Sequence, residues 1–188
     1  MTGATGAIFG VRLLQMLQGT GVETHLVMSK WGSRTLLHET PYAVEEVQQL
    51  ATCVYHCNDQ GALISSGSFV TRGMVVAPCS MRTLAAIAHG QSENLIHRAA
   101  DVVLKERRKL VLVVREAPLN DIHLENMLKL SRMGVVIFPP VPAFYNQART
   151  IDEIVNHIVM RILDQFEIHL GDFSRWDGVM LTGGKFGE

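Results

Sequence analysis

The chain has 188 residues, of which 47% are hydrophobic and 19% are charged, and its formal net charge is −1 at pH 7. This length fits a single domain over residues 1–188, with a C-terminal tail from about residue 167. The near-zero charge argues against nucleic acid as a partner, because phosphate binding needs clustered positive charge. No apolar run approaches the ~18 residues of a membrane helix, so no membrane partner is expected.

Apolar β-branched runs alternate with helical patterns along the chain. This alternation predicts an α/β fold in which a mostly parallel sheet lies between two layers of helices. The first helix follows Gly6, because Ile8, Val11 and Leu14 share one helical face. The remaining expected elements are strands at 23–28, 73–77, 110–114 and 135–138, and helices at about 44–51, after Pro78, and at 121–133. Residues 51–68 are predicted as a loop with one short element.

The last helix has the clearest pattern. Thr150 and Glu153 have the spacing of a capping box. A wide apolar stripe follows, made of Ile151, Ile154, Val155, Ile158, Val159, Ile162, Leu163 and Phe166. Arg161 lies at the edge of this stripe, where its stem can pack on the core while its guanidinium points elsewhere.

The start of the chain reads as a strand-to-helix turn, yet no strand precedes it. In doubly wound sheets the strand that feeds such a turn is usually central. We therefore expect the first strand to be missing, either because the sequence is truncated, which we favour, or because the sheet has an unfilled slot.

Three turns combine glycine, hydroxyl or charged residues with a strand end. In the first, Gly3–Gly6 lets the backbone approach a ligand, and the following helix offers free N–H groups to an anion. The spacing is not that of a dinucleotide binder, and the next strand ends in Ser29 and Lys30 rather than an acid, which favours a mononucleotide phosphate. A tight turn without a ligand is the alternative.

The second turn, residues 77–83, places Ser80 and Arg82 at the start of a helix, where Ser80 either caps the helix or helps to bind an anion. The third places Arg115 and Glu116 directly after an apolar strand, as a phosphate binder and a general acid or base, or as a plain surface ion pair. Because parallel strands end at one edge of a sheet, all three turns are expected to face one crevice.

Cysteine and histidine give little sign of a metal site. The three cysteines, Cys53, Cys57 and Cys79, are an odd and sparse set, which suggests a reducing compartment. The spacing of Cys53, His56 and Cys57 is poor for zinc, so no metal is predicted. His25, His89 and His97 are expected to be structural or solvated.

The sequence resembles the flavin prenyltransferases (UbiX-like proteins, also called phenylacrylic acid decarboxylases) through nearly its whole length. The resemblance is carried by residues 2–6, 23–31, 65–69, 78–81, 98–107, 115–118, 123–128 and 139–145, and the tail at 171–178 looks more like fungal than bacterial members. It implies a Rossmann-like, flavodoxin-like three-layer sandwich and assembly as a homo-oligomer, a dodecamer, with sites at subunit junctions.

The resemblance also implies the chemistry. Members join the prenyl group of dimethylallyl phosphate to N5 and C6 of reduced FMN, and a separate UbiD-type decarboxylase receives the prenylated FMN. The residues that match the family's flavin contacts are Gly3, Ala4, Thr5, Ser29, Ser80, Met81, Arg82, Thr83 and Arg115. Thr5 replaces a serine that many members carry, and the hydroxyl survives.

Other matches concern the prenyl donor and proton transfer. Lys105, Tyr145, Arg161 and Trp176 match the pocket for the prenyl phosphate, where cationic and hydroxyl groups stabilise the leaving oxygens. Glu116 matches the acid implicated in proton transfer, and Glu39 a second acid near the flavin. Aspartate-rich magnesium-binding segments are absent from the sequence, so the reaction is predicted to need no metal.

Three other functions remain open. An FMN-dependent cysteine decarboxylase shares the fold, and His38 could be its catalytic histidine, but the stretch from Pro118 to Asn120 lacks the rest of the motif that it needs. A direct phenylacrylate decarboxylase would release CO2 without a partner, and an FMN carrier would not need a second phosphate pocket. The resemblance implies a mitochondrial location if the protein is fungal and a cytoplasmic one otherwise.

Overall fold

The computed structural model describes residues 1–171, 175, 176 and 178. Its five strands form two parallel sheets rather than one. The first sheet pairs β1 (His25–Val27) with β2 (Cys53–Tyr55), and the second has the order β3 (Gly73–Cys79), β4 (Lys109–Val114), β5 (Val136–Ile137). The predicted α/β fold with parallel strands is confirmed.

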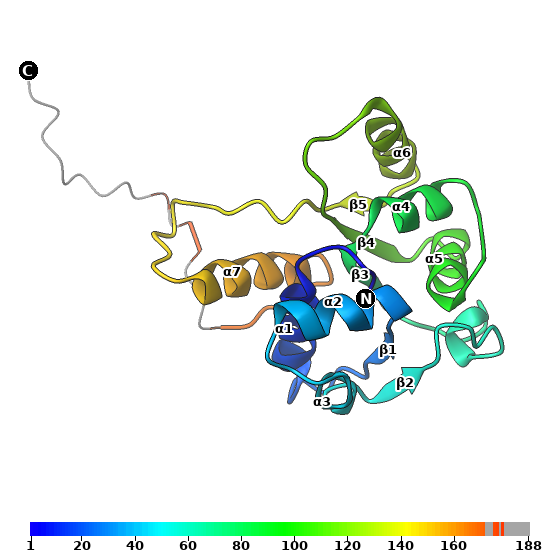
Figure 1. Ribbon diagram of the computed structural model, residues 1–188, viewed down its shortest axis with the longest axis horizontal. Coiled ribbons are helices and arrows are strands. Elements are labelled where there is room, and N and C mark those ends of the chain that lie inside the picture. The colour runs from blue at the N-terminus through cyan, green and yellow to red at the C-terminus, as the bar shows by residue number, and fades with distance from the viewer. Residues whose placement is uncertain (172–174, 177, 179–188) are drawn as a thin grey trace, which may run out of the picture.

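Helices cover both faces of the larger sheet (Figure 1). On one side lie α1 (Ala7–Leu17) and α7 (Ile151–Asp164), whose apolar residues pack on Ala77, Val111 and Val113. On the other side lie α4 (Met81–Ala88) and α5 (Leu95–Lys105), which share a core with Val76, Leu110 and Leu112. The remaining helices are α2 (Lys30–Glu39), α3 (Val44–Gln49), the short 3-10 turn η1 (Leu63–Ser65) and α6 (Asp121–Arg132).

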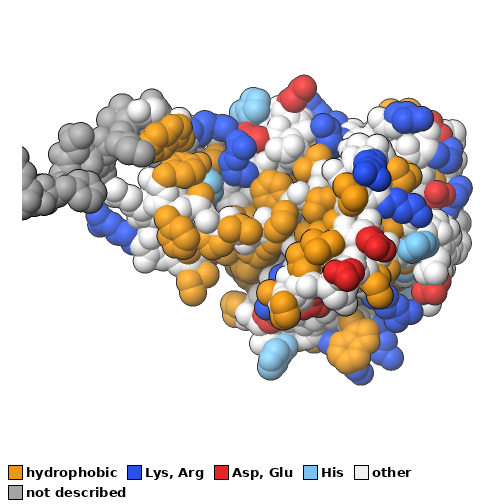
Figure 2. All heavy atoms as spheres, turned by 90° about the horizontal axis from the view of Figure 1, so that it is seen from above, with side chains coloured by type: hydrophobic (Ala, Val, Ile, Leu, Met, Phe, Trp, Pro, Cys, Tyr) orange, Lys and Arg blue, Asp and Glu red, His pale blue; other side chains and the backbone are white. Residues whose placement is uncertain are grey.

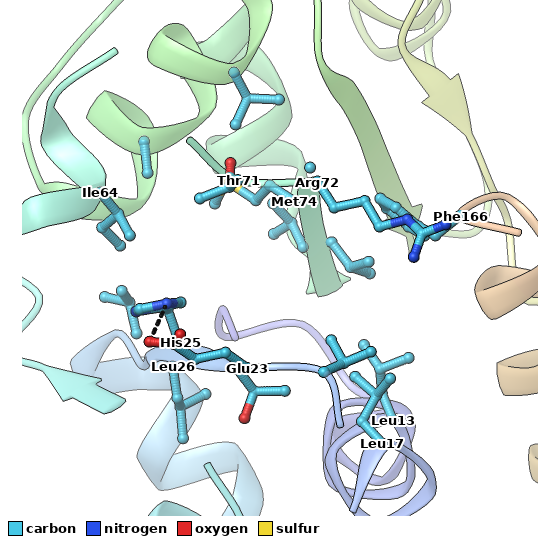
Figure 3. A pocket seen from close by; sticks show the side chains of 18 of the residues that line it. Leu13, Leu17, Glu23, His25, Leu26, Ile64, Thr71, Arg72, Met74 and Phe166 are labelled. Atoms are coloured by element: carbon cyan, nitrogen blue, oxygen red, sulfur yellow. Dashed lines mark ion pairs between the residues drawn. The ribbon is translucent and has the colours of Figure 1, made fainter. Parts of the chain in front are cut away.

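An open slot separates the two sheets. In the described part of the chain, β1 pairs only with β2 and β3 only with β4. Between their facing edges lies a cavity of about 520 Å³, lined mainly by apolar side chains from both sheets and from α1 (Figure 3). This cavity lies between β1 and β3, where a strand was expected from the sequence to be missing.

The first two residues bridge the sheets at one end of the slot. The Met1 ammonium donates to Val27 O at 2.7 Å, and Thr2 N donates to Pro78 O at 3.2 Å. Burial lowers the pKa of the Met1 amine to about 6, because the charged form loses its water. Both contacts continue strand pairing toward the carboxyl edge, so they set the position of the following turn.

Several elements differ from the sequence prediction. Helices α2 and α5 and strand β2 were not predicted, and residues 51–68 contain two short elements, β2 and η1. The stripe of α7 is buried from Val155 to Phe166, but Ile151 is 80% exposed because it precedes the part of the helix that packs on α1. Thr150 caps the helix as predicted, whereas the Glu153 carboxylate accepts from Arg149 N, one residue before the cap.

None of the described helices has the length and hydropathy that crossing a bilayer requires. The three cysteines are all unpaired, Cys79 being buried. The predicted tail from residue 167 lies partly outside the described residues, as do Asp172, Phe173 and Ser174.

Candidate functional site

The three predicted turns meet at the carboxyl edge of the strands. Thr2 Oγ1 donates to Pro78 O at 2.7 Å and accepts from Ser80 N at 2.9 Å, so the first and second turns are joined directly. Arg115 N donates to Cys79 O at 3.3 Å, which places the third turn beside the second. The prediction that the three turns meet at one edge of the sheet is therefore confirmed by these contacts.

Three helices begin at this edge. Ser29 caps α2 by accepting from Gly32 N at 3.0 Å, and Ser29 N donates to Met1 O. Ser80 caps α4 by accepting from Thr83 N at 3.3 Å. Helix α1 begins after Gly6, which has a φ of 97°, a conformation that glycine adopts at little cost. The partial positive charges of three helix N-termini thus point toward one region.

The Glu39 carboxylate binds the free N–H groups at the N-terminus of α1. Its Oε2 accepts hydrogen bonds from Gly6 N at 2.8 Å and Ala7 N at 3.1 Å. This carboxylate sits where the sequence argument placed an anion, because the free N–H groups of a helix attract negative charge. A ligand phosphate would therefore meet the loop of Gly3, Ala4 and Thr5 rather than the first N–H groups of α1.

Gly3 lies against the first turn of α2. A Cβ added at Gly3 would come within 2.5 Å of Trp31 Cβ and 3.3 Å of the Trp31 backbone carbon. Trp31 itself is 62% exposed, and the Arg34 guanidinium stacks on its ring at 5.0 Å. The absence of a side chain at Gly3 keeps the backbone of this loop close to α2.

The charged residues of the edge differ in their partners. Arg115 and Glu116 are exposed at the end of β4, and the Arg115 side chain has no hydrogen-bonded partner among the described residues. Arg82 instead forms an ion pair with Glu93 at 3.2 Å. Met81 is half-buried and Thr83 is buried, so Thr83 contributes mainly to the start of α4.

These features fit the phosphate and ring of FMN. The glycine loop can approach an anion closely, three helix N-termini supply positive potential, and Arg115 is an available cation. The half-buried Met81 and the exposed Trp31 offer apolar surface for a ring. Gly3, Ala4, Thr5, Ser29, Ser80, Met81 and Arg115 are therefore brought together as the sequence predicted, although their roles stay predictions.

A second polar cluster lies along the outer face of α7. The Tyr145 hydroxyl is 3.0 Å from His157 Nε2, and the Tyr145 ring meets the Trp176 ring at 5.6 Å. Burial lowers the pKa of His157, with Arg161 adding to the effect, so the imidazole is neutral at pH 7. The Nε2 of a neutral ring can accept a hydrogen bond from the Tyr145 hydroxyl and hold that hydroxyl in place.

Asp164 organises the other half of this cluster. Its carboxylate accepts from Arg161 at 2.9 Å, from Arg175 at 2.7 and 3.0 Å, and lies 3.0 Å from His169 Nδ1. Hydrogen bonds from Arg175 are the main reason that the pKa of Asp164 falls to about 2. The carboxylate is 9% exposed, so it is an ionised group held in a fixed position.

Within one chain, Lys105 does not belong to the polar cluster on α7. It ends α5 on the opposite side of the sheet from α7, and it pairs with Glu106 (Figure 1). The helix runs back to the amino end of β4, whereas Arg115 follows the carboxyl end. One chain therefore does not assemble Lys105, Tyr145 and Arg161 into a single pocket, and the expectation that sites form at subunit junctions stays a prediction.

His157 and Asp164 were not identified as site residues from the sequence. Residues 157, 161 and 164 follow the i, i+4, i+7 spacing of one helical face. That spacing was a readable signal, because it places three polar side chains on one face of the helix, apart from its apolar stripe. Their partners Tyr145 and Arg175 come from loops and were not predictable from it.

Comparison with known proteins gives one family and several close relatives. The model of the Flavoprotein family matches residues 1–163. A Bacillus subtilis protein named as a UbiX-like flavin prenyltransferase is 63% identical over 179 residues, which cover 95% of this chain and 88% of that protein. The Saccharomyces cerevisiae protein named mitochondrial flavin prenyltransferase PAD1 is 56% identical over 179 residues, covering 95% and 74%.

Two solved structures are similar throughout. AnUbiX (PadA1), in complex with FMN and dimethylallyl pyrophosphate, superposes with a TM-score of 0.94 at 55% identity and covers 96% of each chain. A dodecameric FMN-dependent UbiX-like decarboxylase from Escherichia coli O157:H7 has a TM-score of 0.92 at 57% identity and covers 95% of this chain and 100% of that one.

Proposed function

Because the chain belongs to the Flavoprotein family and, within it, to the UbiX-like flavin prenyltransferases, we propose that it joins the dimethylallyl group of dimethylallyl phosphate to N5 and C6 of reduced FMN. The similar AnUbiX structure binds FMN together with a dimethylallyl donor. In this chain, the main supporting observation is the meeting of three helix N-termini and the available Arg115 at one edge.

The carboxyl edge binds and orients the flavin. The backbone of Gly3–Thr5, the Ser29 hydroxyl and Arg115 contact the FMN phosphate, and Ser80 and Met81 contact the ring system. Reduced FMN supplies the nucleophilic atoms of the reaction when it is bound. The residues of the chain fix its position relative to the donor, which is the larger part of what a protein contributes to such a transfer.

A second set of residues stabilises the departing phosphate. Breaking the C–O bond of the donor builds negative charge on the leaving oxygens, and cationic or hydroxyl donors aimed at them lower the barrier. Lys105, Tyr145 and Arg161 have this role, with His157 orienting Tyr145 and Asp164 orienting Arg161. Glu116, exposed beside Arg115, moves the proton that is lost when the new ring forms.

The complete site requires several subunits. Lys105 lies on the opposite side of the sheet from Arg161, so the phosphate pocket combines residues of neighbouring chains. Residues 138–150 extend away from the body of the chain, with Phe144 82% exposed, and hydrophobic side chains gather on the surface of the molecule (Figures 1 and 2). The chain assembles as a homo-oligomer, with the dodecamer of the Escherichia coli relative as the expected form.

The product and the compartment follow from the same proposal. Prenylated FMN passes to a separate UbiD-type decarboxylase, as the resemblance to the flavin prenyltransferases implies. A mitochondrial location applies if the protein is fungal, as the name of the yeast relative suggests for that protein, and a cytoplasmic one otherwise.

The test is the mass of the flavin after reaction. Purified protein is incubated without oxygen with reduced FMN and either dimethylallyl phosphate or the diphosphate, in the presence of EDTA. The extracted flavin should gain one dimethylallyl unit, and the two arms identify the donor. An unchanged mass in both arms would contradict the proposal and favour an FMN carrier. Release of CO2 from cinnamic acid by the protein alone would favour a direct decarboxylase.

Matched lysine variants test the shared pocket. Lys105→Ala should lower the rate by about 100-fold, because a charged donor to the leaving group is lost. Lys129→Ala, on the exposed face of α6, should leave the rate unchanged. Mixing Lys105→Ala with an inactive Arg161→Ala variant should restore part of the activity if the two residues come from neighbouring chains. A mixture as inactive as its components would contradict the shared pocket.

A further inference from the structure

We propose that Glu23, His25 and Cys53 form a binding site for one zinc ion or a similar divalent transition metal ion. Each offers one ligand atom, and the three atoms lie within 4.8 Å of one another at the amino ends of β1 and β2. Figure 3 shows Glu23 and His25 joined at the rim of the cavity. Glu23 and His25 lie at the amino end of β1, whereas Ser29 follows its carboxyl end, so the group is at the opposite end of the strand from the flavin site.

The sheet itself places these residues together. Side chains alternate across a strand, so Glu23 and His25, two residues apart, point to the same face. In the parallel register His25 lies directly opposite Cys53. The sequence pattern is therefore Glu-x-His on one strand and Cys-x-Tyr on the next, with all four side chains on one face. This differs from the Cys53–Cys57 spacing, which is poor for zinc.

The distances suit a tetrahedral ion. His25 Nε2 is 3.3 Å from Glu23 Oε1, and Cys53 Sγ is 4.0 Å from the same oxygen. Bonds of about 2.0 Å to nitrogen or oxygen and 2.3 Å to sulfur place neighbouring ligand atoms of a tetrahedron roughly 3.3–3.5 Å apart. The first distance already matches, the second is about 0.5 Å too long, and the third, between Nε2 and Sγ, is at most 4.8 Å, so the Cys53 sulfur has to move toward the ion.

The histidine is oriented as a metal ligand. The Tyr55 hydroxyl lies 3.0 Å from His25 Nδ1, which leaves Nε2 toward Glu23 and Cys53. The ring is further held by Phe69, edge-on at 5.2 Å, and by stacking on Tyr55 at 5.8 Å. A hydrogen bond to the second ring nitrogen is the usual support of a metal-binding histidine. Imidazole, thiolate and carboxylate together suit zinc or cobalt better than calcium or magnesium.

A bound ion would crosslink the two short strands β1 and β2. β1 and β2 have three residues each and pair only with one another in the described chain, which makes them a marginal sheet. Three protein ligands leave one position for water, and the ion would add crosslinks at the open end of the slot.

The probe is Co2+, followed by competition with Zn2+. The full chain is stripped of metal, reduced, and titrated with Co2+ while visible and near-ultraviolet spectra are recorded. We expect one equivalent to give tetrahedral d–d bands and a thiolate charge-transfer band, both displaced by one equivalent of Zn2+. Cys53→Ala should abolish the charge-transfer band, and His25→Gln should weaken binding by more than ~100-fold.

Neighbouring residues serve as controls. Cys57→Ser and His56→Gln should bind Co2+ as the parent does, because neither side chain belongs to the group. Tyr55→Phe should weaken binding by about 10–100-fold, as loss of a supporting hydrogen bond does at other metal sites. The inference is wrong if the parent binds no metal at micromolar concentrations, or if the charge-transfer band persists in Cys53→Ala. Circular dichroism of each variant checks that it is folded, which distinguishes a loss of metal binding from unfolding.

Discussion

Asp164 is the residue whose replacement most directly tests the second polar cluster. Asp164→Asn keeps the shape of the side chain and removes the charge that holds Arg161, Arg175 and His169. The arginines would then lack an anionic partner at a position that is 9% exposed. We expect lower stability at neutral pH and weaker binding of the prenyl phosphate, because Arg161 loses the contact that orients it.

The expected loss of stability in Asp164→Asn follows from the pKa of Asp164. The pKa of Asp164 falls from 3.8 to about 2 in the folded chain. At about 1.4 kcal/mol for each unit, this corresponds to an upper value of about 2.5 kcal/mol. Arg161 and Arg175 are 48% and 45% exposed, and water screens their interaction, so we expect a loss of about 1–2 kcal/mol.

The direction of the pKa shift of Asp164 determines how the stability changes with pH. Because the folded pKa lies below the unfolded one, the stabilisation is complete above about pH 4 and disappears as the pH falls toward 2. Urea unfolding of parent and variant from pH 7 to pH 2 should show a constant difference that shrinks only below pH 4. Asp152→Asn, which breaks an exposed pair with Arg12, should cost under about 1 kcal/mol.

Two results would refute this reasoning. A parent and variant of equal stability at pH 7 would show that the arginines gain nothing from the carboxylate. An unchanged KM for the prenyl phosphate would show that Asp164 does not orient Arg161 for that ligand, even if the stability falls.

Three further changes probe the core, the glycine loop and the slot. Leu36→Ala should lower the free energy of unfolding by about 2–5 kcal/mol in urea, because the side chain is fully buried between α2 and α1. Gly3→Ala should raise the Kd for FMN at least ~10-fold by flavin fluorescence, because the new Cβ would collide with Trp31 and displace the loop. An apolar pentapeptide rich in valine and isoleucine, fused before Met1, should fill the slot and raise the free energy of unfolding by about 3 kcal/mol or more in urea.

Each of these has a matched control. Leu37→Ala, 58% exposed, should change stability by under about 0.5 kcal/mol, and equal losses at Leu36 and Leu37 would contradict the packing. Gly61→Ala, where a Cβ meets nothing closer than 3.5 Å, should leave FMN binding intact. A fused pentapeptide of serine and glycine should not stabilise the chain, and equal gains from both fusions would show that the slot does not select an apolar strand.

Local sequence patterns predicted those parts of the structure that depend on neighbouring residues. Strand β4 was predictable because five consecutive apolar residues, all buried, fit a strand covered on both faces. Helix α7 and its Thr150 cap were predictable from the helical period. Helix α2 was missed because it buries only Gly32 and Leu36, so it has no apolar stripe to recognise.

The candidate site was likewise predictable from the sequence only in part. Gly3, Ser80 and Arg115 could be placed together from the sequence, because parallel strands bring their carboxyl ends to one edge whatever the remaining packing. The sequence alone thus determined the parallel α/β class, the turns at that edge and the residues with affinity for an anion. Only the tertiary structure decided that Lys105 and Arg161 lie on opposite sides of the sheet, that a slot opens between β1 and β3, and that Glu23, His25 and Cys53 meet. Those contacts join residues far apart in the chain, and the packing of whole elements, which no local period encodes, sets which of them touch.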